Sequence, residues 1–426
     1  MEVRPGYKQT EVGVIPEDWK LRPMLSAVRV ANGQVDPKLE PYRSMILVAP
    51  DHIEGGSGRL LKKETAGDQS AISGKYVFTR GDIVYSKIRP RLKKAILAEF
   101  DGLCSADMYP LKPAVDVSAG FVLAAILGHQ FSKYAESVSV RSGMPKINRS
   151  ELAEYEIALP PTKAEQEVIA EALSDADALI ESLEQLLVKK RQIKQGAMQE
   201  LLTGKKRLPG FEINPGYKQT EVGVIPEDWE VKSMAELFTF QNGVNADKSA
   251  YGDGVPFINV LEVITHSTIR EDRIPGRIKL TAQAINAFAV QPGDVLFNRT
   301  SETQEEVGLA SVYTGTEAVV FGGFVIRARP RDSRMDTIFI AYSLRSSIFR
   351  SQIVARGQGA VRANIGQQDL SRVLAVLPTK AEQEAIAAVL SDMDAEIAAL
   401  EAKLAKARTL KQGMMQELLT GRIRLV

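Results

Sequence analysis

The chain has almost no cysteine and little histidine for its 426 residues. Its one cysteine, Cys104, excludes a framework of internal disulfides and is typical of a protein from a reducing compartment. The three histidines, His52, His129 and His266, lie far apart and have no partner at the spacing of metal ligands. The sequence therefore predicts neither a disulfide-stabilised fold nor a metal site.

Long apolar runs and a strong charge of one sign are also missing. No run approaches the ~18 residues that cross a bilayer, and the first residues, MEVRPGYKQTE, lack the apolar core of a signal peptide. We therefore expect a cytoplasmic protein with no membrane partner. Because 54 Lys and Arg face 53 Asp and Glu, the net charge of +1 does not indicate a nucleic-acid partner, and only local clusters are informative.

Familiar catalytic motifs are missing as well. A phosphate-binding P-loop is excluded because Gly67 and Gly74 are seven residues apart rather than about five, and Tyr76 replaces the required Ser or Thr. No set of Asp and Glu residues can be connected as an acid/base pair. We therefore expect a chain that is not an enzyme and that holds no cofactor of its own.

What the sequence does contain is an internal repeat. Three segments of the first half return in the second: GYKQTEVGVIPEDW at Gly6–Trp19 and Gly216–Trp229, TKAEQE at Thr162–Glu167 and Thr379–Glu384, and MQELLTG at Met198–Gly204 and Met415–Gly421. The long stretches between these segments differ. Two half-proteins in tandem, with matching ends and divergent interiors, favour one scaffold that presents two different recognition surfaces.

Each half contains one long predicted helix. Thr162 with Glu165, and Thr379 with Glu382, form capping-box patterns directly after proline. Apolar residues then alternate steps of four and three, which is the pattern of a coiled-coil seam. The seam residues are Ile169, Leu173, Ala176, Ile180, Leu183 and Leu187 in the first helix, and Ile386, Leu390, Met393, Ile397, Leu400 and Leu404 in the second.

Two pairs of glycines mark these helices. Gly204 and Gly421 are predicted to end them. Gly196 and Gly413 lie inside, where glycine costs about 1 kcal/mol relative to alanine. These internal glycines are compatible with a close helix crossing or with a kink.

The charges of both helices are polarised along their length. Acidic residues dominate the first part of each helix and basic residues the second, which suits the helix dipole. An antiparallel pair would place acidic parts against basic parts, whereas a parallel pair would place like charges together. We therefore predict antiparallel pairing. The alternative is two ordinary surface helices, each packed on its own domain.

The two interiors are predicted to be mixed α/β. Apolar β-formers on either side of Gly-Asp turns predict strands at 76–78, 83–85, 288–290 and 295–297. Helical segments are expected near 120–137 and 336–353. The predicted fold is α+β: two tandem domains with twisted sheets, separated by two long helices that pair as an antiparallel coiled coil.

A dense basic stretch follows the predicted strand at 83–85. Lys and Arg side chains neutralise phosphates, and Arg can bind a guanine edge through two hydrogen bonds. The alternative is a solvated strand edge, because lysine commonly protects sheet edges. The residues are Lys87, Arg89, Arg91, Lys93 and Lys94.

A loop rich in glycine and in polar residues precedes each long helix. Ile147 and Ile365 each lie five residues before a leucine, which predicts that the two loops are structurally equivalent. Glycine permits close backbone approach, and Arg, Lys, Asn and Gln contact bases and phosphates; a loop with no ligand is the alternative. The candidates are Arg141, Ser142, Gly143, Lys146 and Asn148 in the first loop, and Arg356, Gln358, Arg362 and Asn364 in the second.

The second half carries further candidates beside its predicted strand at 295–297. Asn298, Arg299 and Thr300 stand where Ser86 and Lys87 stand in the first half. Four arginines downstream add positive charge or form a solvated face: Arg327, Arg329, Arg331 and Arg334.

Together these motifs resemble the DNA-specificity (S) subunit of type I restriction–modification enzymes. The resemblance rests on both GYKQTEVGVIPEDW segments, the Gly-Asp strand turns, the helix starts LPPTKAEQE and LPTKAEQE, and the helix ends MQELLTG. It covers essentially the whole chain. The longer loop at 356–365, compared with 141–147, departs from the pattern.

The resemblance implies two target-recognition domains, at 1–161 and, with a linker, at 205–378, each recognising one half of a bipartite, asymmetric DNA site. The helices at 162–204 and 379–426 would fix the spacer. The implied partners are double-stranded DNA, two methyltransferase (M) subunits and motor-nuclease (R) subunits. S-adenosylmethionine, ATP and Mg would bind only to those partner subunits.

Two other functions compete with this interpretation. One is a helical scaffold protein that does not recognise DNA. The other is a self-contained DNA methyltransferase or nuclease, which the missing cofactor and acid motifs disfavour.

Overall fold

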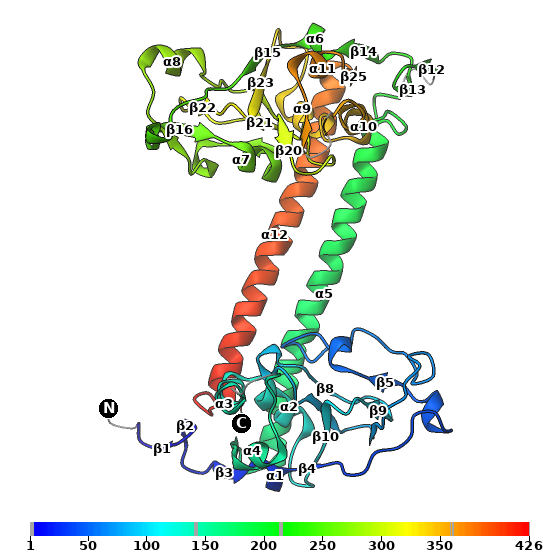
Figure 1. Ribbon diagram of the computed structural model, residues 1–426, viewed down its shortest axis with the longest axis vertical. Helices are drawn as coiled ribbons and strands as arrows, with labels where there is room; N and C mark the ends of the chain where they lie inside the picture. The colour runs from blue at the N-terminus through cyan, green and yellow to red at the C-terminus, as the bar shows by residue number, and fades with distance from the viewer. Residues whose placement is uncertain (1–3, 140–143, 213–215, 358, 360–361, 426) are drawn as a thin grey trace. The chain divides into compact units, whose positions relative to one another are not determined.

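The structure, a computed structural model, describes residues 4–139, 144–212, 216–357, 359 and 362–425 (Figure 1). The chain divides into two compact units. Unit 1 comprises Met1–Leu186 and Leu400–Val426, and unit 2 comprises Leu187–Ala399. Each unit therefore combines the interior of one repeat with segments of both long helices.

Unit 1 is built around a four-stranded antiparallel sheet in the order β4-β10-β7-β8, at Val28–Val30, Met108–Pro113, Ile83–Ser86 and Ala95–Leu97. A second sheet has the order β5-β9-β6, at Leu47–Val48, Gly102–Cys104 and Tyr76–Phe78. β1 (Tyr7–Thr10) and β2 (Gly13–Pro16) form a hairpin, and β3 (Lys20–Pro23) pairs with β11 (Glu156–Leu159). The helices are α1 (Met24–Ala27), α2 (Ala119–Leu127), α3 (His129–Val138) and α4 (Arg149–Glu154), with 3-10 turns η1 (Tyr42–Ser44), η2 (Pro50–His52) and η3 (Pro90–Leu92).

Unit 2 repeats this order around a five-stranded sheet β15-β23-β19-β21-β17, at Phe238–Asn242, Val325–Pro330, Val295–Asn298, Ala310–Tyr313 and Thr268–Ile269. A second sheet is β18-β16-β22, at Arg277–Ile278, Tyr251–Ile258 and Val320–Phe321. The pairs are β12 (Tyr217–Thr220) with β13 (Gly223–Pro226), β14 (Glu230–Ser233) with β25 (Leu374–Leu377), and β20 (Thr300–Ser301) with β24 (Ala363–Asn364). The helical segments are α6 (Met234–Leu237), α7 (Val260–Thr265), α8 (Ala282–Ala287), α9 (Thr337–Ser343), α10 (Ser347–Arg356), α11 (Gln367–Ser371), η4 (Lys248–Ala250) and η5 (Glu271–Arg273).

The predicted α+β class with two tandem mixed domains is confirmed, but some local predictions differ. Of the expected strand at 288–290, Phe288 caps helix α8 instead, and only Val290 forms an isolated bridge, with Val319. Each expected helical segment is two helices. The first breaks at Gly128, where a Cβ would lie 3.0 Å from the Ala125 carbonyl oxygen.

The long helices α5 (Lys163–Leu201) and α12 (Lys380–Leu418) pair in antiparallel fashion within each unit, as predicted. In unit 1, Arg408 contacts Glu184 at 2.7 Å, and Lys411 is bonded to Asp177. In unit 2, a 2.6 Å ion pair joins Lys190 to Glu396, and a 2.5 Å ion pair joins Lys194 to Asp394. In both units the partner number falls as the α5 number rises, so acidic and basic segments meet.

The repeated TKAEQE segment fastens each long helix to its unit. Thr162 accepts the Glu165 N–H at 3.2 Å, which confirms half of the predicted capping box. The Glu165 side chain does not return to the cap, because it binds Arg424 at 2.7–2.8 Å. Gln166 accepts the backbone N–H of Ser118, the residue that caps α2. The motif therefore serves long-range contacts as well as helix initiation.

The same arrangement recurs in unit 2 with one addition. The fully buried Glu382 accepts bonds from Arg207 at 2.5 and 2.8 Å and from the indole of Trp229 at 2.9 Å. Arg207 also bonds to Asp228 at 3.0 Å. Gln383 accepts the backbone N–H of Asp336, which caps α9.

Glycines end both helices where the opening motif packs against them. Gly421 has φ of 67°, and a Cβ there would lie 2.5 Å from Pro16. Gly204 has φ of 71°, and its Cβ would lie 2.4 Å from Pro226. The end of α12 lies beside α3 in unit 1 (Figure 1). At Gly196 and Gly413 a Cβ would meet no described atom within 4 Å, so neither marks a close helix crossing.

Among the described residues, no helix is long and apolar enough to cross a membrane.

Candidate nucleic-acid interface

The basic stretch of unit 1 is the connection between the paired strands β7 and β8. Its backbone turns sharply because Arg89 and Lys93, on either side of η3, adopt left-handed φ angles of 47° and 49°. Ser86 is buried at the end of β7 and donates to the Ile88 carbonyl at 3.2 Å. The stretch is therefore a shaped loop on the rim of the sheet.

This loop meets the second predicted segment. Ile88 forms an antiparallel bridge with Lys146. The Arg89 N–H donates to the Pro145 carbonyl at 2.8 Å, and the Ile147 N–H donates to the Lys87 carbonyl at 2.9 Å. The two candidate segments, 87–89 and 145–147, thus form one edge. Arg141, Ser142 and Gly143 lie outside the described residues.

The cations of this edge divide into two groups. Lys94 donates to the Pro50 carbonyl at 2.6 Å and so supports the fold. The side chains of the other group make no hydrogen bond or ion pair with any described residue, and their charge is available to a ligand: Arg89, Arg91, Lys93 and Lys146. The N–H of Asn148 donates to Glu151 at the start of α4, which gives this asparagine a structural role too.

The sequence patterns did not predict three further residues at the edge: Tyr109, Arg149 and Asn32. Two cations lie over the ring of Tyr109, the Lys87 ammonium at 5.2 Å and the Arg149 guanidinium at 5.7 Å from the ring centre. Burial raises the pKa of the Tyr109 phenol. Arg149 is also bonded to Asn32 and to the Ala31 carbonyl. These residues come from separate elements that meet only in the folded unit, so no local sequence signal could have found them.

Unit 2 builds the same edge with other side chains. The Ile365 N–H donates to the Arg299 carbonyl at 3.0 Å, as Ile147 does to Lys87 in unit 1. Ile147 and Ile365 are both buried beneath their loops. The predicted equivalence of the two loops therefore appears in the backbone contacts of both units.

The predicted residues of this second edge differ in availability. Asn298 is 1% exposed and donates to the Glu306 carbonyl, so it holds the loop from inside. Thr300 donates to Asn364 at 2.7 Å, and Arg356 donates to the Gln352 carbonyl at 3.0 Å. The Arg299 side chain is exposed and makes no hydrogen bond or ion pair with a described residue.

Two other predicted residues belong to the second loop in the sequence. Arg362 lies 3.8 Å from Glu302, and both side chains are largely exposed. Gln358 lies outside the described residues.

The four downstream arginines serve the fold of unit 2. Arg329 bonds to the buried Asp294 at 2.7 and 2.8 Å, and these bonds raise the pKa of Arg329. Arg327 is buried and bonds to Gln241 and to a backbone carbonyl. Arg331 and Arg334 donate to backbone carbonyls or to a neighbouring carboxylate. Their positive charge is largely compensated within the unit.

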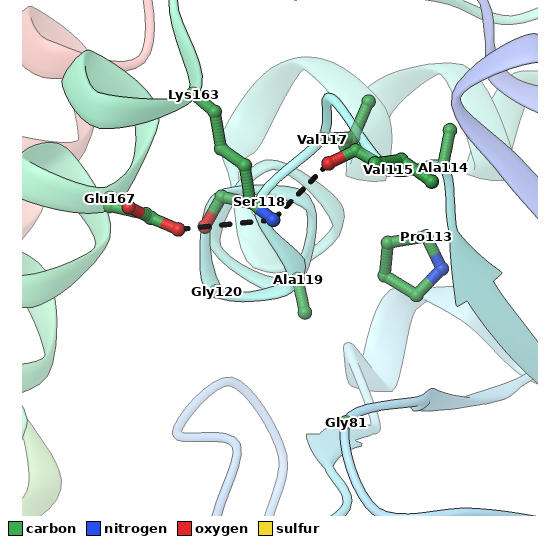
Figure 2. Close-up of a pocket in the computed structure, with 10 residues that line it drawn as sticks. All are labelled: Gly81, Pro113, Ala114, Val115, Val117, Ser118, Ala119, Gly120, Lys163 and Glu167. Atoms are coloured by element: carbon green, nitrogen blue, oxygen red, sulfur yellow. Dashed lines mark hydrogen bonds and ion pairs between the residues drawn. The ribbon is translucent and has the colours of Figure 1, made fainter.

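A shallow pocket of about 480 Å³ in unit 1 lies at the start of α5 (Figure 2). Lys163 crosses it, with its ammonium 3.2 Å from the Val115 carbonyl and 4.0 Å from Glu167. The pocket contains none of the candidate residues. No group of three potential metal-ligating side chains occurs among the described residues. The two edges offer cations, amides and hydroxyls, which bind phosphates and base edges.

Comparison with known proteins agrees with this chemistry. The family described as type I restriction modification DNA specificity domain matches residues 52–191 and 226–408. The Escherichia coli type I restriction enzyme EcoDI specificity subunit is 29% identical over 57% of this chain and 53% of that protein. A Methanocaldococcus jannaschii protein that carries the name type I restriction enzyme MjaX specificity subunit is 27% identical over 99% of this chain and 97% of its own length.

A solved structure shares the fold. It comes from a study of complex assembly and conformational transition of the type I R-M system, and its matching chain has a TM-score of 0.58 at 18% identity. The alignment covers 96% of this chain and 99% of the other. Since the family match spans well over half of the sequence, the protein belongs to the type I restriction modification DNA specificity domain family, whose members are non-catalytic components of these systems.

Proposed function

We propose that this chain is the DNA-specificity subunit of a type I restriction–modification complex and recognises a bipartite, asymmetric site. In this proposal, residues 1–161 bind one half-site and residues 205–378 bind the other, and the helices at 162–204 and 379–426 set the spacer. One observation carries the proposal: the Lys87–Ile147 and Arg299–Ile365 bonds define the same edge twice, with different exposed side chains. Two equivalent backbone frames that present different side chains are suited to recognise two different DNA sequences.

The proposal places all catalysis in partner subunits. Two M subunits would hold S-adenosylmethionine and methylate adenine, and R subunits would bind ATP and Mg and cleave DNA. The edges of the two units would supply phosphate and base contacts to double-stranded DNA.

The two opening hairpins support the idea of two identical partners. Residues 6–19 and 216–229 are identical even at the exposed positions Glu11 and Glu221. Several exposed positions between the repeated helix ends have meanwhile diverged, for example Leu179 to Glu396 at the repeat offset of 217. A purely structural role would preserve only the buried residues. Identical exposed surfaces are expected where each hairpin contacts a copy of the same M subunit.

Partner counting tests this docking surface. Native mass spectrometry of the complex should find two M subunits per chain, and one after Glu221→Lys. Leu410→Lys, at an exposed position of α12, is the control and should keep two. If Glu221→Lys also keeps two, the hairpin is not the docking surface.

The DNA function is tested by co-expressing the chain with its M partner and mapping methylated adenines in the host genome. A single two-part motif is expected. Binding of the purified complex to a duplex with that motif should weaken steeply as salt rises. A scaffold that does not recognise DNA would give no motif and no salt-dependent binding, and a self-contained methyltransferase would give the motif without the partner.

A further inference from the structure

Phe324 is a large aromatic side chain that unit 2 leaves 60% exposed at its candidate edge. Its backbone lies directly beside that of Arg299, because the Arg299 N–H donates to the Phe324 carbonyl at 2.9 Å. An isolated exposed apolar residue is ordinary on a protein surface. Phe324 differs from such a residue because it lies within the candidate edge of unit 2.

The backbone that presents Phe324 is tightly packed. The Gly322 N–H donates to the Ile258 carbonyl at 3.0 Å, and the Gly323 N–H donates to the Val244 carbonyl at 2.9 Å. A Cβ on Gly322 would lie 2.6 Å from the ring of Phe257. These bonds and contacts hold the backbone of the turn in a fixed place, and Phe324 directly follows Gly323. A backbone already held in position loses little entropy when its segment binds a ligand.

The neighbours of Phe324 are groups that contact base edges. Arg299 suits the two acceptors of guanine, and an apolar side chain such as phenylalanine suits the methyl group of thymine in the major groove. In unit 1 the equivalent position is Asp107, whose carbonyl accepts the Lys87 N–H at 3.0 Å. A carboxylate cannot make the apolar contact, so the two units differ in chemistry at this point of a shared frame.

We infer that Phe324 is a specificity-determining residue that packs on a thymine methyl group in the half-site recognised by unit 2. This inference rests on the proposed DNA recognition and adds the base and the group that are contacted.

The test removes the thymine methyl group and the Phe324 ring separately. The motif methylated by the wild-type complex is determined first, and duplexes with this motif then carry deoxyuridine in place of each thymine in turn, which deletes only the methyl group. At one thymine of a single half-site, wild-type affinity should fall about four-fold, the value of one buried methylene-sized group. The Phe324→Ala complex should bind the thymine and deoxyuridine duplexes equally, and Phe324→Leu should keep most of the difference.

Leu39→Ala is the matched control, because Leu39 is also 60% exposed but belongs to unit 1. It should leave the deoxyuridine response of the unit 2 half-site unchanged. The inference is overturned if no thymine distinguishes wild type from Phe324→Ala, or if Phe324→Ala weakens both half-sites equally. A wild-type complex with no two-part motif would instead remove the proposed function itself.

Discussion

The loops that follow the equivalent strands β7 and β19 of the two units have opposite charge. In unit 1, residues 87–94 connect β7 to β8 and contain five basic residues and no acidic one. In unit 2, residues 299–309 connect β19 to β21 and contain one basic residue, Arg299, and three glutamates, Glu302, Glu305 and Glu306. Both loops start from the same backbone frame, anchored by Ile147 or Ile365. The frame therefore fixes where a loop is presented and leaves its electrostatics free.

This contrast suggests a division of roles between the units. A loop with several free cations strengthens binding to any phosphate backbone and makes it sensitive to salt. A loop with one arginine among glutamates is repelled by phosphates unless its polar groups find partners on base edges. Unit 1 should thus contribute more general affinity, and unit 2 more of its binding energy through base contacts.

The ion-pair clusters at the helix starts differ as well. Glu382 in unit 2 is enclosed by Arg207, whose side chain is 7% exposed, and by Trp229. Glu165 in unit 1 is bound by Arg424, whose side chain is 33% exposed. Both glutamates are buried, and the arginine that binds the glutamate is more deeply buried in unit 2.

The largest expected effect follows from this burial. Glu382→Ala leaves the Arg207 cation buried and deprived of its closest partner, which should lower the free energy of unfolding of unit 2 by about 3–5 kcal/mol. Glu165→Ala should cost unit 1 about 1.5–3 kcal/mol, because Arg424 can turn to water. The chain has two tryptophans, one in each unit, so urea unfolding followed by fluorescence in a Trp19→Phe or Trp229→Phe background reports on one unit at a time. Equal losses would contradict the difference in burial.

A second comparison concerns the tryptophans themselves. Both indoles are fully buried, but the Trp229 N–H donates to Glu382, whereas the Trp19 N–H has no partner among the described residues. Trp229→Phe should therefore lower the free energy of unfolding of unit 2 by about 1.5–3 kcal/mol more than Trp19→Phe lowers that of unit 1. This difference is the value of a hydrogen bond to a charged group. Thermal unfolding followed by circular dichroism measures both variants. The loss of ring packing is common to both and cancels in the difference.

Local patterns in the sequence predicted the long helices, their pairing and the two equivalent loops. The capping threonines, the seam leucines and the polarity of helix charge were sufficient to predict two long helices and their antiparallel pairing. The shared spacing of Ile147 and Ile365 predicted that the two loops are equivalent.

Contacts between distant segments were not predictable in this way. Glu165 has the spacing of a capping box, but Arg424, 259 residues away, takes its carboxylate. Asn298 is of a residue type that often contacts DNA, but the loop folds over Asn298 and buries it. Tyr109 and Phe324 join the edges only through strand register, which the order of residues along the chain does not reveal.

The next largest effect concerns the recognition of a single base pair. Arg299→Ala should reduce discrimination against the wrong base at one position by about 1–3 kcal/mol and leave the other half-site unchanged. Competition binding with duplexes that vary one base pair at a time measures this loss. Arg329→Ala is the control, because its guanidinium is already bound to Asp294: it should lower the stability of unit 2 and leave the preferred sequence unchanged. A relaxed motif in the control would show that stability alone alters recognition.

The smallest effect per residue concerns the loop charges. Removing one cation that binds a phosphate should make the slope of log affinity against log salt shallower by about 0.9. Alanine at Arg89, Arg91 or Lys93 should therefore reduce the slope without altering the motif, because a bond to phosphate carries no sequence information. Glutamine at Glu302 or Glu305 removes repulsion instead, so affinity should rise for all sequences while the slope stays or steepens. Titrating the complex with duplex between about 50 and 200 mM salt separates these outcomes. If both loops respond alike, the opposite charges are ordinary solvated surface and the units contribute equally to general affinity.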